Sequence, residues 1–380
     1  MKVSEYFSET YEDARQRFLD AAQAAGGRLT SYENPHGLGP NGARLFMDVA
    51  QFGPANVETV LLNISGTHGA EGYGGSAVQT AWIRDVGPRA LPSGVGVIMV
   101  HALNPFGFAW GLRGTENNVD LNRNFVDHMQ PHPANPLYEE LHRILCPDSL
   151  SDAAIQKMLA AGARFVERHG QWALEDAISR GQYTHADGYH FGGTKPEWSN
   201  IVLQGIVARM LSHAHRVGFI DWHSGPVGDG ELIHLCYSEP GSPAYRRAGD
   251  WWGRNALDPK TVDAMWGSKR PTRRGTIFSG IEDMLGSHAQ FAGAVIEFRS
   301  AVTKNNAAKA MRVPMLERWL RFIGGFDAPE APAYFEEIRE DYAPRRLSWR
   351  ENVITNGLAC YEQTFKGLAE WSREGLKAAD

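Results

Sequence analysis

The sequence has few cysteines, no long apolar run and no block of charges of one sign. Its three cysteines, Cys146, Cys236 and Cys360, are widely spaced and form no C-x-x-C pair. This argues against a disulfide framework and against cysteine ligands for a metal, and we expect reduced thiols in a cytoplasmic protein. No apolar stretch approaches the roughly 20 residues of a transmembrane helix. The first residues lack the apolar core of a secretory signal peptide, so we expect neither secretion nor a membrane partner.

Charge and composition narrow the range of partners further. Charged residues make up 22% of the chain, the formal net charge is −6, and basic residues form no stripe that could neutralise phosphates. We therefore expect no nucleic-acid partner. Apolar residues make up 43% of the 380 positions, which is enough to bury a large core around one sheet.

The order of apolar and amphipathic segments predicts the fold class. Apolar residues have helical spacing over residues 4–24, over residues 73–84 and through much of 135–216, and the turn sequence Asn34-Pro35-His36-Gly37 separates the first two strands. This alternation predicts an α/β fold: a mixed, largely parallel twisted sheet with helices on both faces. The seven predicted strands are Leu29–Glu33, Ala43–Gln51, Glu58–Ile64, Val95–His101, Val217–Asp221, Glu231–Tyr237 and Ala294–Phe298.

The chain is predicted to contain one main domain, residues 1–326, with a helical insertion at about 135–216. A short proline-containing link follows, and residues 327–380 carry apolar residues at helical spacing. We expect this terminal helix to pack either on the domain or on a partner subunit, so the chain could form a homo-oligomer. Within the insertion, the glycine-rich loop 183–198 is interpreted either as a substrate lid or pocket wall, or as a solvent-exposed connector.

Three potential metal ligands lie next to the ends of predicted strands. His68 and Glu71 are three residues apart in a glycine-rich turn after the strand that ends at Ile64, and His223 follows the strand that ends at Asp221. In α/β sheets, ligands bind beyond the carboxyl ends of the strands. Two imidazoles and one carboxylate, with a fourth position left for water, are the donor set of a catalytic Zn²⁺ site. Mg²⁺ and Ca²⁺ prefer oxygen ligands.

A further carboxylate, Glu297, lies in the apolar strand segment 295–298. An unpaired carboxylate is costly to bury, so its presence there needs a reason. Catalysis as a general base is one reason, and an ion pair with Arg299 is the structural alternative. Asp221, two residues before His223, is a candidate to orient an imidazole from its far side.

The strongest single motif lies between residues 113 and 125. The motifs His68-x-x-Glu71, Asn104-Pro105-x-Gly107, Asp120-x-Asn122-Arg123-Asn124-Phe125, His223-Ser224 and Glu297 follow one another along the chain. In this order they resemble the motifs of the zinc carboxypeptidases and their relatives, the murein-peptide amidases and the succinylglutamate desuccinylase and aspartoacylase-type deacylases. The resemblance covers about residues 55–300. Within that superfamily, the sequence is similar to an uncharacterised bacterial branch.

The resemblance implies a zinc carboxypeptidase-like (phosphorylase/hydrolase-like) fold and a role for each motif residue. His68, Glu71 and His223 would be the ligands of Zn²⁺. Arg113 would stabilise the oxyanion, Asn122 and Arg123 would hold a substrate carboxylate, and Glu297 would be the general base and then the general acid. The residue types suit these roles. The guanidinium of Arg123 can donate two parallel hydrogen bonds to a carboxylate, and the carboxylate of Glu297 can relay a proton from water to a leaving amine.

We therefore predict a zinc-dependent hydrolase that cleaves an amide bond next to a free carboxylate, in a short peptide or an N-acyl amino acid. Two alternatives stay open: a small-metabolite deacylase or esterase of the aspartoacylase type, and a non-catalytic protein that binds carboxylates. The interval between Glu71 and His223 is longer than we expect for the peptidases, so the substrates of that family do not carry over directly. Tyr183 and Tyr237 are candidates for a substrate-capping tyrosine by residue type alone.

Overall fold

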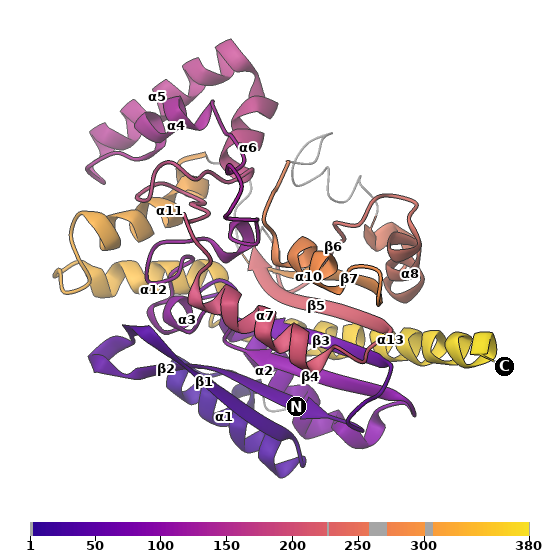
Figure 1. Cartoon of the computed structure of the whole chain (residues 1–380). Coiled ribbons are helices and arrows are strands. Elements are labelled where there is room, and N and C mark those ends of the chain that lie inside the picture. The colour runs from indigo at the N-terminus through magenta and orange to yellow at the C-terminus, as the bar shows by residue number, and fades with distance from the viewer. Residues whose placement is uncertain (1–2, 226–227, 258–271, 301–306, 380) are drawn as a thin grey trace.

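A computed structural model describes residues 3–225, 228–257, 272–300 and 307–379. Its centre is a seven-stranded sheet with the strand order β1-β2-β4-β3-β5-β7-β6 (Figure 1). The four strands β4, β3, β5 and β7 are parallel, while β1 and β2 on one side and β6 on the other add antiparallel pairs. The strands are β1 (Arg28–Leu38), β2 (Arg44–Phe52), β3 (Thr59–Ser65), β4 (Val95–His101), β5 (Arg216–Gly225), β6 (Leu232–Leu235) and β7 (Gln290–Arg299).

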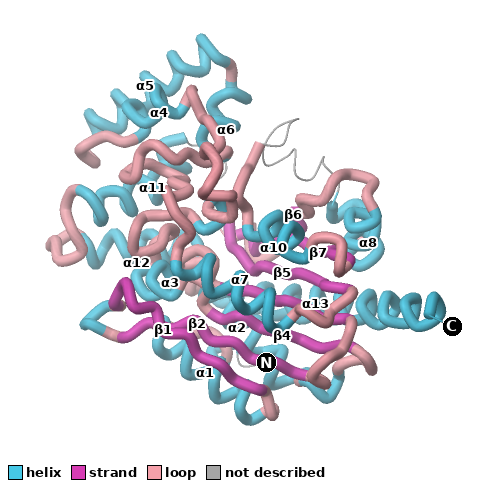
Figure 2. Tube along the Cα trace, viewed as in Figure 1, coloured by secondary structure: helices cyan, strands magenta, loops and turns pink. Residues whose placement is uncertain are grey.

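Helices cover both faces of the sheet, as Figure 2 shows. The alternation of side chains along β5 identifies the two faces. The Cα of Gly218 faces Leu368 of α13, whereas the ring of the next residue, Phe219, packs edge-on against Phe278 of α10. The predicted α/β class, a mixed and largely parallel sheet between helices, is confirmed.

The helices lie in three groups. α1 and α13 both contact α2 on one face of the sheet, α7 contacts α10 on the other, and α4, α5 and α6 contact one another in a separate lobe (Figure 1). None of the helices in the described part of the chain is long and apolar enough to cross a bilayer. The helices are α1 (Tyr11–Ala24), α2 (Gly72–Ala81), α3 (Pro105–Trp110), α4 (Tyr138–Leu145), α5 (Asp152–His169), α6 (Gln171–Ser179), α7 (Trp198–Met210), α8 (Pro243–Trp252), α10 (Ile277–Leu285), α11 (Ala307–Phe322), α12 (Ala331–Tyr342) and α13 (Leu347–Ala379).

The lobe formed by α4, α5 and α6 has an apolar core of its own. Tyr138, Leu141 and Phe165 are buried there, and Tyr189 of the following loop packs against them. The lobe falls within the predicted helical insertion, and it contacts the rest of the chain partly through α11.

All seven predicted strands are present, but three local expectations were wrong. The first helix begins at Tyr11 rather than near residue 4, because the Thr10 side chain caps it by accepting a hydrogen bond from Asp13 N. The expected turn 34–37 lies inside β1 at a register shift; β1 is an edge strand, where a proline costs no ladder hydrogen bond. His223 lies within β5 rather than in a turn beyond it.

The C-terminal helices pack on the main core. Trp349, Ile354, Tyr361 and Leu368 of α13 are fully buried in the same cluster as the central strands. The Tyr361 hydroxyl donates a 2.6 Å hydrogen bond to Asn63 Oδ1 in β3. The division of the chain at residue 326 stays a prediction, although α13 and the sheet share one core.

Candidate metal centre

His68, Glu71 and His223 are brought together by two neighbouring parallel strands. His68 lies in the turn that follows β3, and Glu71 directly precedes α2. This turn needs its glycines, because Gly66 has φ +71° and a Cβ on Gly69 would lie 2.3 Å from the carbonyl oxygen of Leu112. β5 pairs with β3, so its residue His223 reaches the same place from the next strand.

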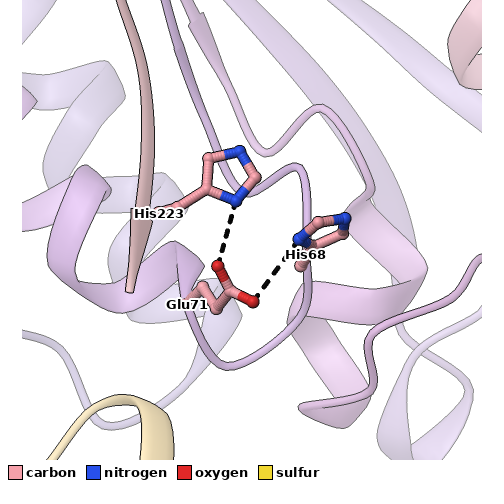
Figure 3. Close-up of side chains that lie close together, drawn as sticks. All are labelled: His68, Glu71 and His223. Atoms are coloured by element: carbon pink, nitrogen blue, oxygen red, sulfur yellow. Dashed lines mark hydrogen bonds and ion pairs between the residues drawn. The ribbon is translucent and has the colours of Figure 1, made fainter. Parts of the chain in front are cut away.

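The three side chains converge in a buried cluster (Figure 3). His223 Nδ1 lies 3.0 Å from one Glu71 carboxylate oxygen, and His68 Nδ1 lies 3.4 Å from the other. Each of the three residues is at most 4% exposed. The two imidazole rings stand edge to face with their centroids 4.8 Å apart, so both Nδ1 atoms point toward the same carboxylate.

A second carboxylate holds each imidazole from its far side. Asp120 Oδ1 lies 3.1 Å from His68 Nε2, and Asp221 Oδ2 lies 2.7 Å from His223 Nε2. In metal sites, such outer carboxylates fix the tautomer and the orientation of the ligating histidines. Here they leave Nδ1 of each ring as the atom that could bind a metal. Asp221 therefore lies where a residue that orients His223 should lie.

The donor set fits a zinc ion. His68 Nδ1 is buried and, apart from its 3.4 Å ion-pair contact with Glu71, has no hydrogen-bond partner among the described residues, which is costly for a polar atom unless something else binds it. Two imidazole nitrogens and one carboxylate match the ligand set of catalytic zinc sites. Burial alone would raise the pKa of Glu71, but the two histidines outweigh it and hold that pKa below its usual value. The Glu71 carboxylate is therefore anionic at neutral pH.

Arg113 lies beside this cluster and is anchored by the same outer carboxylate. Its Nε lies 3.0 Å from Asp120 Oδ2, and its Nη1 lies 3.5 Å from Glu71 Oε1. His190 Nδ1 also contacts Asp120 Oδ2, at 2.9 Å. Although burial acts to raise it, the pKa of Asp120 is held well below its usual value, chiefly by the positive charges of Arg113 and Arg123.

Arg123 is deeply buried, and its guanidinium donates to internal carbonyl groups. Nε and Nη2 donate to Ser179 O at the end of α6, and Nη1 donates to Asn122 O. These three bonds leave two N–H groups of the guanidinium for another acceptor. Burial lowers the Arg123 pKa to about 10, and the hydroxyl of Tyr183 donates to the carbonyl of Arg123.

The neighbours of Arg123 show how this block is built. Asn122 Oδ1 accepts a 3.0 Å hydrogen bond from the backbone N–H of Ile277 at the start of α10. Part of loop 183–198 is buried against the block, including Gly192, on which a Cβ would lie 2.8 Å from the carbonyl oxygen of Arg123. This part of the loop packs beside Arg123, whereas His185 and Asp187 are partly exposed.

Glu297 lies on β7 directly across from His223 of β5. Burial is the main cause that raises its pKa, and the charge of Glu71 adds to the effect. Within the described part of the chain, Glu297 forms no ion pair with Arg299, which was the structural alternative for its presence. Arg273 lies close enough to oppose the rise in the Glu297 pKa; Arg270, which belongs to the same basic segment of the sequence, lies outside the described residues.

The sequence pattern did not indicate that the C-terminal helices reach this site. Glu317 of α11 accepts a 3.1 Å hydrogen bond from the backbone N–H of Arg113, and Tyr342 ends α12 beside them. With Asp120 and His190, these residues line a cavity of about 50 Å³. Burial raises the Glu317 pKa to about 7. No sequence motif contains Glu317, Tyr342 or His190, because they come from segments that lie far from the motifs along the chain and reach the site only in the fold.

Comparison with known families yields one match. The model of the family described as "Protein of unknown function (DUF2817)" matches residues 7–356. No curated protein matches the sequence.

Solved structures give looser likenesses. Bovine thrombin-activatable fibrinolysis inhibitor, solved with tick carboxypeptidase inhibitor, is 11% identical, with 97% of this chain and 99% of that chain covered and a TM-score of 0.47. Carboxypeptidase A from Helicoverpa armigera is 14% identical over 87% and 73% of the two chains, with a TM-score of 0.43. A protein assigned to the succinylglutamate desuccinylase/aspartoacylase family, from Shewanella amazonensis, is 16% identical over 83% and 73%, with a TM-score of 0.31. These proteins belong to the groups whose motifs the sequence resembles. Because their TM-scores are below 0.5, the likenesses add nothing to the description of the site.

Proposed function

The chain belongs to the DUF2817 family, whose description gives no function, and we propose that it is a zinc-dependent hydrolase. The proposed reaction is cleavage of an amide bond next to a free carboxylate, in a short peptide or an N-acyl amino acid. The observation that carries this proposal is the buried His68–Glu71–His223 cluster, in which each imidazole turns Nδ1 toward Glu71.

His68, Glu71 and His223 would hold the zinc ion. When bound, zinc polarises a carbonyl group and lowers the pKa of water toward ~7. Glu297, on the strand next to His223, is placed to take a proton from the attacking water and to return it to the leaving amine. Its raised pKa suits both halves of that transfer.

Arg113 is the candidate to stabilise the negative charge that develops on the carbonyl oxygen. Its guanidinium lies 3.5 Å from Glu71, and its side chain is 27% exposed, so Arg113 borders the proposed metal ligands and is also partly accessible to solvent. A positioned donor of this kind contributes about 3–4 kcal/mol to transition-state stabilisation.

Asn122 and Arg123 are the candidates to hold the substrate carboxylate. The contacts of Arg123 with Ser179 O and Asn122 O orient its guanidinium and leave two N–H groups for this role. A substrate without that carboxylate would leave these donors unused. The alternative, a deacylase or esterase of the aspartoacylase type acting on a small metabolite, is separated from the proposal by its substrates: N-acyl amino acids would turn over and ordinary peptides would not.

The first test combines metal analysis with a substrate panel. The purified protein is expected to bind zinc through the His68 cluster, and the His223→Ala variant is expected to lose that ion. Turnover of N-acyl amino acids and dipeptides is expected to stop when a chelator removes the metal and to return with added zinc. Amidated analogues of the same substrates are expected to react poorly, since they lack the carboxylate that Arg123 would bind.

Each other outcome selects a different function. Equal turnover of free and amidated substrates would contradict the carboxylate clamp. Turnover of N-acyl amino acids or simple esters without turnover of dipeptides would favour the deacylase or esterase. Binding of carboxylates without zinc and without turnover would contradict the hydrolase and favour a non-catalytic binding protein.

A further inference from the structure

A second group of metal-binding side chains lies where the helical lobe meets α11. His142 belongs to α4, and His185 and Asp187 belong to the loop after α6. One nitrogen or oxygen atom of each lies within 4.8 Å of the others. We infer that these three residues, together with Glu139, form a binding site for a divalent transition-metal ion of the zinc type, separate from the His68 cluster.

The contacts within the group already pair each imidazole with a carboxylate. His142 Nε2 lies 2.9 Å from Asp187 Oδ1, and His185 Nε2 lies 2.8 Å from Glu139 Oε2. The two rings are stacked with their centroids 3.9 Å apart and a 13° angle between their planes. Glu139 and His142 are three residues apart on α4, so they lie on the same side of the helix. The ligand atoms of His142, His185 and Asp187 already lie within 4.8 Å of one another, and Glu139 would join them by rotation of its side chain.

The chemistry of these four groups suits zinc. Two imidazole nitrogens and two carboxylate oxygens form a mixed set that a borderline-soft ion accepts, whereas Ca²⁺ and Mg²⁺ prefer oxygen alone. Four protein ligands without an open position are typical of a structural rather than a catalytic zinc ion. The side chains are partly exposed, with 17% exposure for His142 and 22% for His185, so an ion can reach them from solvent.

Arg318 of α11 lies next to the proposed ligands and contacts Asp187. Its Nη2 lies 2.9 Å from Asp187 Oδ2, the oxygen that does not face His142. The arginine therefore fixes the carboxylate and leaves Oδ1 for an ion, as outer-shell partners do in metal sites. Its Nε also donates to the carbonyl of Asp187. Arg143 lies 3.8 Å from Glu139 Oε1 on the exposed side.

An ion at this position would fasten three parts of the chain to one another. It would join α4 to the loop that carries His185 and Asp187, and the Asp187–Arg318 pair joins that loop to α11. The same loop carries His190, whose Nδ1 contacts Asp120 beside the candidate metal centre. The inferred site would therefore hold in place a segment that borders the centre, although it rests on its own residues and not on the proposed reaction.

The test counts zinc ions per chain by equilibrium dialysis and elemental analysis at neutral pH. Two ions are expected for the wild type, and one each for His142→Ala, His185→Gln and His223→Ala. The double variant His142→Ala/His223→Ala is expected to bind none. His169→Ala is the matched control, because this exposed histidine belongs to the same lobe and contacts a single carboxylate, Glu140, at 3.5 Å. The His169→Ala variant is expected to bind two zinc ions, as the wild type does.

The counts separate this inference from the proposed function. One ion that persists in both His142→Ala and His185→Gln but is lost in His223→Ala would overturn the second site and leave the first. One ion that is lost in His142→Ala and kept in His223→Ala would support the second site and contradict the first. Two ions in both the His142 and the His185 variants would also overturn the inference. His185→Gln keeps the size of the side chain, so a folding defect in His142→Ala would not decide the result.

Discussion

Glu297 is a carboxylate whose proton affinity is set by its neighbours. Burial and the charge of Glu71 raise its pKa, while His223 and Arg273 oppose that rise. A carboxylate with a raised pKa is a stronger base than one in water, and its protonated form persists closer to neutral pH, so it can return the proton in the second half of the proposed reaction. The position of Glu297 opposite a proposed zinc ligand therefore matters as much as its residue type.

Replacement of Glu297 by glutamine tests this role directly. Glu297→Gln keeps the size of the side chain but cannot accept a proton, so kcat is expected to fall by roughly 10²–10⁴-fold while the zinc content stays unchanged. The measurements are steady-state kinetics and elemental analysis of the same sample. Glu239→Gln, an exposed position, is the control. Full activity in Glu297→Gln would show that another group is the base.

At the scale of elements, α13 covers the centre of the sheet that carries the site. Leu368 of this helix is fully buried and lies against Gly218 of β5, on which a Cβ would be only 2.9 Å from Leu368 Cδ2. Tyr361 of the same helix bonds to Asn63 of β3. The helix therefore contacts the two strands that lead to His68 and His223.

Truncation of Leu368 is expected to weaken this packing. Leu368→Ala would remove a fully buried side chain and leave a cavity, which lowers the free energy of unfolding by about 2–5 kcal/mol. Denaturant unfolding followed by circular dichroism measures the change. Lys366→Ala, on the exposed side of α13, should stay close to the wild type. If both variants unfolded at the same denaturant concentration as the wild type, the helix would contribute little to stability.

At the scale of the whole molecule, buried histidines make the fold sensitive to acid. Burial lowers the pKa of His101 to about 4, and burial also lowers that of His234 to about 4. In the unfolded chain both would titrate near 6.5. As pH falls below that value, the unfolded state binds protons that the folded state does not, so stability decreases down to about pH 4.

The expected contribution of His101 is up to about 3 kcal/mol over this range. His101→Gln should therefore lose less stability than the wild type between about pH 6.5 and about pH 4. Comparison of the two pH profiles of unfolding free energy isolates this histidine, because other groups contribute equally to both. One such group is Glu317, whose raised pKa acts in the opposite direction. His36→Gln, at an exposed position, should run parallel to the wild type, and a parallel profile for His101→Gln would contradict the prediction.

The fold was largely predictable because its central strands are mostly apolar runs. β3 and β4 are buried at every position, and such runs stand out from the amphipathic helices around them. The turn expected at Asn34–Gly37 was wrong because an edge strand accepts a proline that an inner strand would not. The proline at position 35 thus indicated a break where the backbone only shifts register.

The candidate site was predictable where its residues share short motifs. His68 and Glu71 lie in one turn, and Asp120 lies in the same block as Arg123. Glu317 and His190 could not be found in this way, since they reach the site through the packing of α11 and of a loop. The same holds for Ser179, whose carbonyl accepts from Arg123. Contacts between distant segments leave no local pattern in a single sequence.

The strand order also sets the order in which the site can be completed during synthesis. β3 lies between β4 and β5, yet β5 begins only about 150 residues after β3 ends. At the usual 5–20 residues per second, the ribosome takes roughly 8–30 s to make that interval. Throughout it, one edge of a fully buried strand has no native partner, which is the state in which nascent chains depend on chaperones. His68 and Glu71 would leave the ribosome well before His223, so the nascent chain cannot carry the complete His68–Glu71–His223 cluster until more than half of it has been made.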